Sequence, residues 1–315
     1  MADARPQALR AAVAAELARP VMPEATALAE AIRARHGDTV AAVLFYGSCL
    51  RTGDLEGLLD FYVLVDSLRA FHGGALAAAA NAALPPNVAY WELPVGGRTV
   101  RAKVAIMTRR QFRRAVRPES QDTTIWARFA QPAALVLARD GQARDWAAEA
   151  VAAAVATAVR WSVRLGPSSG TPLEFWTALF RHTYAAELRA ERAERPGHIV
   201  DTDPARYAAL FRPALEAGGI TAAETGAGVL SPALDPAERR AAARGWAVRR
   251  RLGKVLNVAR LVKAAFTFAG GVDYLAWKVE RHSGVRVELT PWQRRHPILS
   301  APRILWRLRR QGAVR

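Results

Sequence analysis

The chain has 315 residues, 51% of them apolar, and carries a formal net charge of +17 at pH 7. This length and composition exclude an intrinsically disordered chain and leave room for more than one domain. No uninterrupted apolar run reaches the ~20 residues of a transmembrane helix, so we expect a soluble or peripheral protein. The single cysteine, Cys49, excludes an internal disulfide framework and a zinc site built from cysteines.

Apolar periodicity and turn residues predict an α+β domain with a mixed sheet in the first half of the chain. Pro20 and Pro23 interrupt a helical segment near the N-terminus, and Pro85-Pro86 closes a later alanine-rich helix. In chain order we expect helices within 7–36, strands at 41–45 and 60–65, a helix at 67–83, strands at 87–95 and 98–107, a short helix and a connection after 109, and a strand at 133–138.

A β-hairpin is predicted around Gly96-Gly97, because a two-residue turn of this kind fixes the register of the flanking strands. In that register Glu92 lies opposite Arg101 and Tyr90 lies opposite Lys103, all on one face. The opposite face carries apolar side chains: Trp91, Leu93, Val100, Ala102 and Val104. A polar sheet face beside a carboxylate suits a triphosphate, although a solvent-facing sheet shows the same alternation.

The second half of the chain is predicted to be helical. Residues 146–161 and 173–194 are the longest helical candidates, and residues 239–268, 272–282 and 291–310 are expected to form further helices. We therefore divide the chain into a domain at 1–145 that contains the sheet and the N-terminal helices, a helical domain at 146–238, and a C-terminal region at 239–315.

The net charge is concentrated in the C-terminal region. Residues 239–315 hold 19 of the 45 Lys and Arg but only 3 of the 28 Asp and Glu. Nucleic acid and an anionic lipid surface are the two partners that such a basic region favours, and a merely solvated basic face is the third interpretation. Apolar residues at helical spacing around 258–268 predict a helix that either lies on a membrane or packs on its neighbours.

A motif with chemical meaning runs from Tyr46 to Asp66. The expected strand at 41–45 leads into Gly47 and Ser48, where a small residue lets the backbone approach a phosphate and a hydroxyl adds a donor. Asp60 then opens the next apolar strand, which places a carboxylate at the mouth of a sheet, as in sites that hold Mg²⁺ together with substrate phosphates. The alternative is a structural turn followed by a strand that begins with Asp.

With these residues in view, the chain resembles the mitochondrial phosphatidate cytidylyltransferases, which are CDP-diacylglycerol synthases with a nucleotidyltransferase (polymerase-β-like) fold. The resemblance runs from about Val43 to Tyr207 and is thinner beyond Pro132. It rests on these segments, in order: Tyr46-Gly47-Ser48, Leu59-Asp60-Phe61, Val63 to Asp66, Phe71-His72, Arg101 to Ile106 with Lys103, Ala127-Arg128-Phe129, Tyr184 to Arg189, and Ile199-Val200.

The resemblance implies a Mg²⁺-dependent enzyme that joins CTP to phosphatidic acid, with an anionic membrane surface as its partner. It would be cytoplasmic and peripheral on the inner face of the membrane, or on the matrix side of the mitochondrial inner membrane in a eukaryote. Its residues would include catalytic Asp60, Lys103 and Arg128, nucleotide-binding Tyr46, Gly47, Ser48 and Lys103, and metal-binding Asp60, Asp66 and Glu92.

Three of these positions have a second interpretation. Six strand residues span ~20 Å, so Asp66 suits the N-cap of the next helix better than a metal shared with Asp60. Glu92 suits a salt bridge with Arg101, and Arg128 could also belong to a structural salt bridge. Position 62, where related nucleotidyltransferases carry a second acid, is Tyr62. The rival functions are therefore a nucleotidyltransferase acting on RNA and a non-catalytic nucleotide-binding protein.

Overall fold

The computed structural model describes residues 4–55, 57–186, 199–226, 228–267 and 289–295. Five strands form its main sheet: β1 Val40–Tyr46, β2 Leu59–Val65, β3 Asn87–Val95, β4 Arg98–Thr108 and β5 Ala133–Ala138. Their order is β3-β4-β2-β1-β5, and β2 and β4 run parallel while the other neighbours are antiparallel. The α+β class and the mixed sheet expected from the sequence are therefore present.

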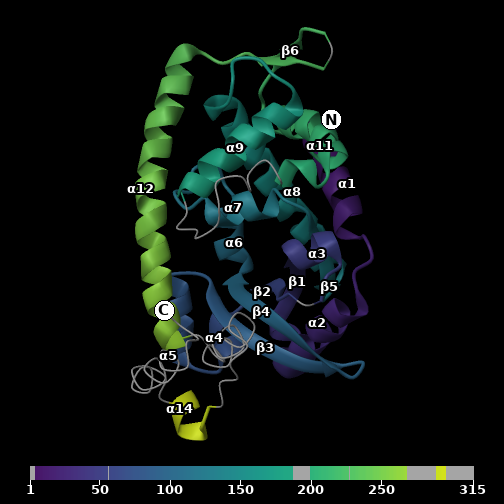
Figure 1. Cartoon of the computed structure of the whole chain (residues 1–315), viewed down its shortest axis with the longest axis vertical. Coiled ribbons are helices and arrows are strands. Elements are labelled where there is room, and N and C mark those ends of the chain that lie inside the picture. The colour runs from purple at the N-terminus through teal and green to yellow at the C-terminus, as the bar shows by residue number, and fades with distance from the viewer. Residues whose placement is uncertain (1–3, 56, 187–198, 227, 268–288, 296–315) are drawn as a thin grey trace, which may run out of the picture.

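Helices cover both faces of this sheet (Figure 1). Their bounds are α1 Ala4–Leu17, α2 Pro23–His36, α3 Ser48–Thr52, α4 Leu68–His72, α5 Ala75–Ala83, α6 Arg109–Ala115, α7 Thr124–Phe129, α8 Gly141–Leu165, α9 Pro172–Ala186, α11 Pro204–Ala217, α12 Pro236–Thr267 and α14 Pro291–Arg295. A 3₁₀ turn, η1 Gly37–Thr39, precedes β1, and a small hairpin is formed by β6 Ala222–Glu224 and β7 Leu230–Pro232.

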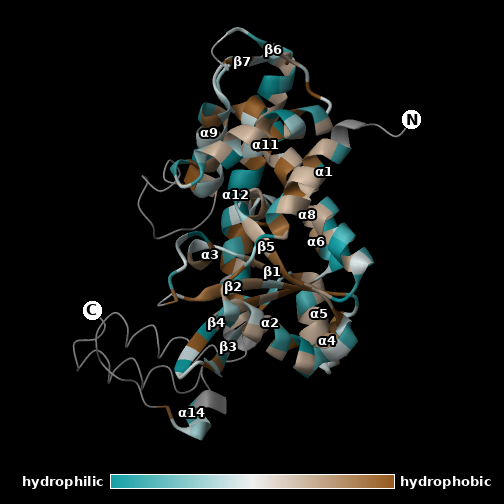
Figure 2. Cartoon of the chain, turned by 90° about the vertical axis from the view of Figure 1, so that its right-hand side faces the viewer, coloured by the Kyte–Doolittle hydropathy of each residue, from teal (hydrophilic) through white to brown (hydrophobic). Residues whose placement is uncertain are grey.

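The central strands are buried on both faces, because alternate side chains enter two different cores. On β2, Tyr62 and Leu64 join a core made with the helical layer that includes α7, α8, α9 and α11. Phe61 and Val63 point the other way and pack with α2. Figure 2 shows this apolar colour along β1 and β2 between the two layers. The first core is continuous from the sheet to the helices, so the two predicted domains share it.

A buried ion pair fastens the helical layer to the edge of the sheet. Arg206 on α11 donates to both carboxylate oxygens of Glu16 on α1, and both side chains are nearly inaccessible. The same Glu16 accepts from the backbone N–H of Ala133 in β5, while Arg206 also donates to the carbonyl of Ala130. Each charge is thus compensated by hydrogen bonds, as a buried pair requires.

Three element boundaries differ from the sequence-based expectation. The helix expected at 67–83 is split into α4 and α5 at Gly73-Gly74, because Gly73 has a φ of 66° and ends the first helix. The connection expected after 115 contains the short helix α7. The predicted boundary at 145/146 falls inside α8, which begins at Gly141 and is capped by Asp140 accepting from the N–H of Ala143 at 2.7 Å.

The C-terminal basic region begins with α12, which packs along the body of the molecule (Figure 1). Trp246 on this helix is buried against Trp126 and Trp161. Further along α12, Lys263 donates to the carbonyls of Leu84 and Pro86. Part of the basic block is therefore structural, and a boundary at 239 would cut through a helix of the shared core. The predicted helix at 272–282 and the part of 291–310 beyond 295 lie outside the described residues.

Candidate functional site

One row of residues crosses four neighbouring strands at the same level of the sheet. Asp60 on β2 lies between Tyr46 on β1 and Lys103 on β4, and Lys103 is in turn opposite Tyr90 on β3. Residues paired in register project to the same face of a sheet, and here that face is the one turned toward the helical layer. The predicted hairpin register is confirmed. The parallel pairing of β4 with β2 then brings Lys103 next to Asp60.

Gly47 makes the approach to Asp60 sterically feasible. Its φ is +95°, a backbone conformation that residues with a Cβ rarely adopt. A Cβ placed at this position would lie 2.9 Å from Asp60 Oδ2. The chain turns at Gly47 from β1 directly into α3, whose first residue, Ser48, is exposed. The Gly-Ser turn and the strand-borne carboxylate are therefore adjacent.

The carboxylate of Asp60 has no partner among the residues that the structure describes. It makes no hydrogen bond and no ion pair with any residue in the described part of the chain. Burial raises its pKa, and the positive charges of Lys103, Arg128 and Arg51 oppose that rise. Three cations thus act on one acidic group at distances greater than that of a direct ion pair.

Arg128 comes to this site from the short helix α7. Its guanidinium donates to the hydroxyl of Tyr62 at 2.9 Å and lies over the ring of Tyr46, 5.2 Å from the ring centroid. Tyr62 is fully buried and lies two residues after Asp60 on the same face of β2. A neutral hydroxyl therefore orients Arg128 at this position, and Asp60 is the acid on this side of β2.

Arg51 is the site residue that the sequence reading missed. It lies on α3, three residues after Ser48, and its charge acts on Asp60. The helix that carries it is only five residues long and is bounded by Gly47 and Gly53. The signal that could have found it is the glycine pair, since two glycines six residues apart allow a single helical turn between them.

Glu92 binds neighbouring side chains of the hairpin and does not join Asp60 in the predicted metal site. Its Oε1 accepts from the hydroxyl of Tyr90 at 2.7 Å and from Arg101 Nε at 3.1 Å. Burial, and then the hydrogen bond to the Glu92 carboxylate, raises the pKa of Tyr90. The salt bridge with Arg101, the second interpretation of this residue, is thus the one present.

Asp66 is separated from Asp60 by the length of β2. Its two carboxylate oxygens accept from Arg109 Nε at 2.7 Å and from an Arg139 nitrogen at 2.8 Å. The expected N-cap role is also wrong, because the next helix is capped by Ser67, whose hydroxyl accepts from the N–H of Ala70. Asp66 instead ties β2 to the segments that follow β4 and β5.

The predicted three-carboxylate metal set is therefore not assembled. Across residues 4–55, 57–186, 199–226, 228–267 and 289–295, no group of three His, Cys, Asp or Glu is arranged to hold a metal. Asp60 forms no hydrogen bond or ion pair within the described segments and lies beside a glycine turn and three cations. One such carboxylate fits Mg²⁺ that arrives with a polyphosphate, because this ion is commonly bound by one or two carboxylates plus substrate phosphates.

Comparisons with known proteins add no further constraint. No protein-family model matches this sequence, and a search of curated proteins gives no significant match. Within the described segments, none of the helices combines the length and the apolar character of a membrane-spanning segment. The functional argument therefore rests on the geometry around Asp60.

Proposed function

We propose that this protein is a Mg²⁺-dependent nucleotidyltransferase that joins CTP to phosphatidic acid and releases pyrophosphate, giving CDP-diacylglycerol. The observation that carries the proposal is the carboxylate of Asp60, which lies beside the Gly47 turn, is acted on by the charges of Lys103, Arg128 and Arg51, and forms no hydrogen bond or ion pair within the described residues. A triphosphate is a polyanion that guanidinium and ammonium groups bind through charge-assisted hydrogen bonds, and one carboxylate suffices for an ion that is shared with phosphate oxygens.

The residues would divide the work of an in-line displacement at the α-phosphorus. The attacking oxygen belongs to the phosphate of phosphatidic acid, which is already anionic at neutral pH, so positioning rather than a strong general base is needed. Lys103, Arg128 and Arg51 would bind the triphosphate and neutralise the charge that spreads onto pyrophosphate as the α–β bridging bond breaks. When bound, Mg²⁺ would supply further charge neutralisation, and Asp60 would hold it.

Arg128 is the cation whose orientation is most tightly defined. The Tyr62 hydroxyl and the Tyr46 ring restrict its guanidinium on two sides, and a guanidinium binds phosphate in a fork geometry. In this proposal Tyr46 positions Arg128 and does not itself bind the nucleotide. Ser48, exposed at the start of α3, stays a proposed phosphate donor.

The outer surface of α12 supports an anionic membrane as the proposed partner. Its exposed apolar side chains recur at helical spacing: Val248, Leu252, Val255, Val258 and Val262. Exposed basic residues lie on the same helix: Arg244, Arg250, Arg251 and Lys254. An apolar stripe bordered by cations is the pattern of a helix that lies in the interface of an anionic membrane.

The membrane partner is tested by flotation of the full chain with vesicles that contain phosphatidic acid. Val255→Glu and Val258→Glu should each weaken flotation, because they place a negative charge within the apolar stripe. Ala243→Glu is the matched control, since Ala243 is exposed on the same helix outside the stripe. High salt should weaken flotation without abolishing it. Equal flotation of all three variants would contradict a role for this surface.

One observation favours a second candidate, a nucleotide-binding protein without transferase activity. Tyr62 replaces the second acid, and its hydroxyl interacts with Arg128. The deciding experiment incubates the purified chain with each nucleoside triphosphate, Mg²⁺ and phosphatidic acid vesicles or RNA, and identifies products by mass analysis. CDP-diacylglycerol from CTP supports the proposal. Nucleotide addition to RNA supports a polymerase-like function, and nucleotide binding without any product supports the second candidate.

A further inference from the structure

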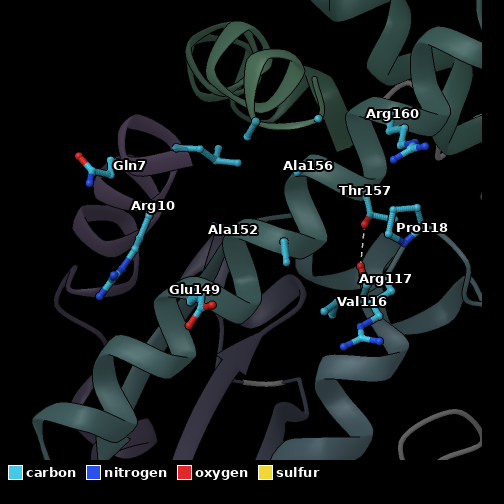
Figure 3. A pocket seen from close by; sticks show the side chains of 14 residues that line it. Gln7, Arg10, Val116, Arg117, Pro118, Glu149, Ala152, Ala156, Thr157 and Arg160 are labelled. Atoms are coloured by element: carbon cyan, nitrogen blue, oxygen red, sulfur yellow. Dashed lines mark hydrogen bonds between the residues drawn. The ribbon is translucent and has the colours of Figure 1, made fainter. Parts of the chain in front are cut away.

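An open pocket of about 460 Å³ lies away from Asp60, between α1, α8, α11 and the segment that follows α6 (Figure 3). Its floor is apolar and includes Leu9, Val116, Ala152 and Ala156. A hydrogen bond from the Thr157 hydroxyl to the carbonyl of Val116 at 2.6 Å closes the floor between α8 and the end of α6. Pockets of this size and lining are typical of small-molecule sites.

An uncompensated arginine lines this pocket. Arg160 on α8 is half-buried, and its Nε is inaccessible to solvent and has no hydrogen-bond partner. Among the residues that the structure describes, its side chain makes no ion pair. Arg164 follows one helical turn later; its Nε is also buried and unbonded, while another nitrogen of its guanidinium lies 3.8 Å from a carboxylate oxygen of Glu238. Burial, and then the charge of Arg160, lowers the pKa of Arg164.

This arrangement is unfavourable without an anion. Like charges four residues apart on a helix repel, and a buried donor without an acceptor costs about 1–3 kcal/mol. Natural structures seldom retain such a group unless something binds it. Arg160 therefore points to a ligand that carries negative charge.

The two ends of the pocket differ in their charge. Arg117 lies at the same end as Arg160 in Figure 3, is exposed, and has no ion pair with any described residue. At the other end Arg10 is already paired with Asp145 at 3.0 Å, and Glu149 adds a negative charge. Free positive charge is thus confined to one end of an apolar floor.

We propose that this pocket binds a single-chain anionic amphiphile, with a carboxylate head group between Arg117 and Arg160 and an alkyl chain along the apolar floor. A guanidinium binds a carboxylate in a bidentate geometry, and the alanine-rich floor gains from covering by methylene groups. The floor makes a free fatty acid a better fit than a small inorganic anion. This site is independent of the nucleotidyltransferase proposal, because none of its lining residues surrounds Asp60.

The test is titration calorimetry of the full chain with decanoate, below the concentration at which it forms micelles. Decanol, decylamine and inorganic phosphate serve as matched probes for the chain without the charge, the opposite charge, and the charge without the chain. The proposal expects saturable binding of decanoate at one site and at least tenfold weaker binding of the other three. Equal binding of decanol would show a purely apolar groove, and equal binding of phosphate a plain anion site. Either result would overturn the proposal.

Variants separate the head-group site from the floor. Arg160→Met keeps the aliphatic stem and removes the charge, so it should weaken decanoate binding about tenfold or more. Ala153→Trp, at an exposed lining position, should block the floor while both arginines remain. Arg114→Met is the control, because Arg114 is exposed on α6 and does not line the pocket. Unchanged decanoate binding in both Arg160→Met and Ala153→Trp would refute the site even if the wild-type chain binds decanoate.

Discussion

The two aspartates at the ends of β2 have opposite environments. Asp66 is paired through both oxygens, with Arg109 and Arg139, and hydrogen bonds from these arginines lower its pKa although burial opposes them. Asp60 faces three cations, yet it forms no hydrogen bond or ion pair with the described residues, and burial raises its pKa. Both carboxylates have positively charged neighbours, but only Asp66 accepts hydrogen bonds from them.

This difference matches the proposed division between a structural carboxylate, Asp66, and a functional one, Asp60. The charge of a carboxylate that already binds two guanidinium groups is largely compensated, which weakens its attraction for a metal ion. In the proposed site, a carboxylate that is kept apart from its cations would allow phosphate oxygens and an ion to bridge the charges. A perturbed pKa together with an unused hydrogen-bonding capacity is a feature that clusters at functional sites.

The strongest test of this comparison removes the negative charge of each aspartate in turn. Asp60→Asn should reduce nucleotidyl transfer on the order of a hundredfold or more, because it removes the charge that holds Mg²⁺ and keeps the shape of the side chain. Asp66→Asn should leave turnover within about twofold, since its pairs are partly exposed and such pairs contribute little. Steady-state assays of both variants, with melting curves as the folding control, make the comparison. Equal losses would contradict the assignment of separate roles.

Much of this site follows from the sequence, because its parts depend on local patterns. The Gly96-Gly97 turn fixed the hairpin register, and the apolar alternation placed Lys103 and Asp60 at strand positions. The parts that were missed depend on short or long-range features. A five-residue helix between two glycines gives no periodic signal, so Arg51 was overlooked. On α12, Arg249 and Lys263 donate to carbonyls that are more than 100 residues away in the sequence, and no local pattern predicts such contacts.

A smaller effect is expected from the cations around Asp60. Lys103→Met keeps the aliphatic stem and removes the charge, so it should raise the KM for CTP about tenfold or more while the fold is unchanged. Arg101→Met is the matched control, because Arg101 lies on the same strand face but is paired with Glu92. The comparison is made by titrating CTP at saturating acceptor. A KM that shifts in Arg101→Met and stays constant in Lys103→Met would place the triphosphate at the outer part of the hairpin.

The glycine turn provides a third test with an internal control. Gly47→Ala combines a strained backbone with a Cβ that would lie 2.9 Å from Asp60 Oδ2, so it should cost about 1–3 kcal/mol of stability and also reduce turnover. Gly53→Ala, at the other end of α3, has a positive φ but no neighbour within 4 Å of the added Cβ. It should cost about 1–2 kcal/mol and leave turnover nearly unchanged. Denaturant unfolding and activity are measured on both; similar turnover in the two variants would show that the approach of Gly47 to Asp60 is irrelevant to function.

The smallest expected effect is the pH dependence of stability, in which the two aspartates should have opposite signs. The raised pKa of Asp60 means that the folded state binds its proton more tightly than the unfolded state does. Wild-type protein should therefore lose stability relative to Asp60→Asn as the pH rises above the pKa of an aspartate in the unfolded chain, about 3.9. The lowered pKa of Asp66 gives stability that is present above that value and is lost as pH falls through the folded pKa.

The check is the free energy of unfolding of wild type, Asp60→Asn and Asp66→Asn between about pH 3 and pH 7. The difference from wild type should grow with pH in favour of Asp60→Asn and against Asp66→Asn. Parallel curves for the two variants would mean that both carboxylates are compensated in the same way, and the distinction between the ends of β2 would be lost.

The central claim is that Asp60 holds Mg²⁺ together with a nucleoside triphosphate. It is tested most directly by calorimetric titration of CTP into wild type, Asp60→Asn and Asp66→Asn, each with and without Mg²⁺. We predict that Mg²⁺ strengthens CTP binding to wild type and to Asp66→Asn, and that this dependence on Mg²⁺ disappears in Asp60→Asn. An identical Mg²⁺ dependence in Asp60→Asn and wild type would contradict the assignment of Asp60 and, with it, the proposed transferase site.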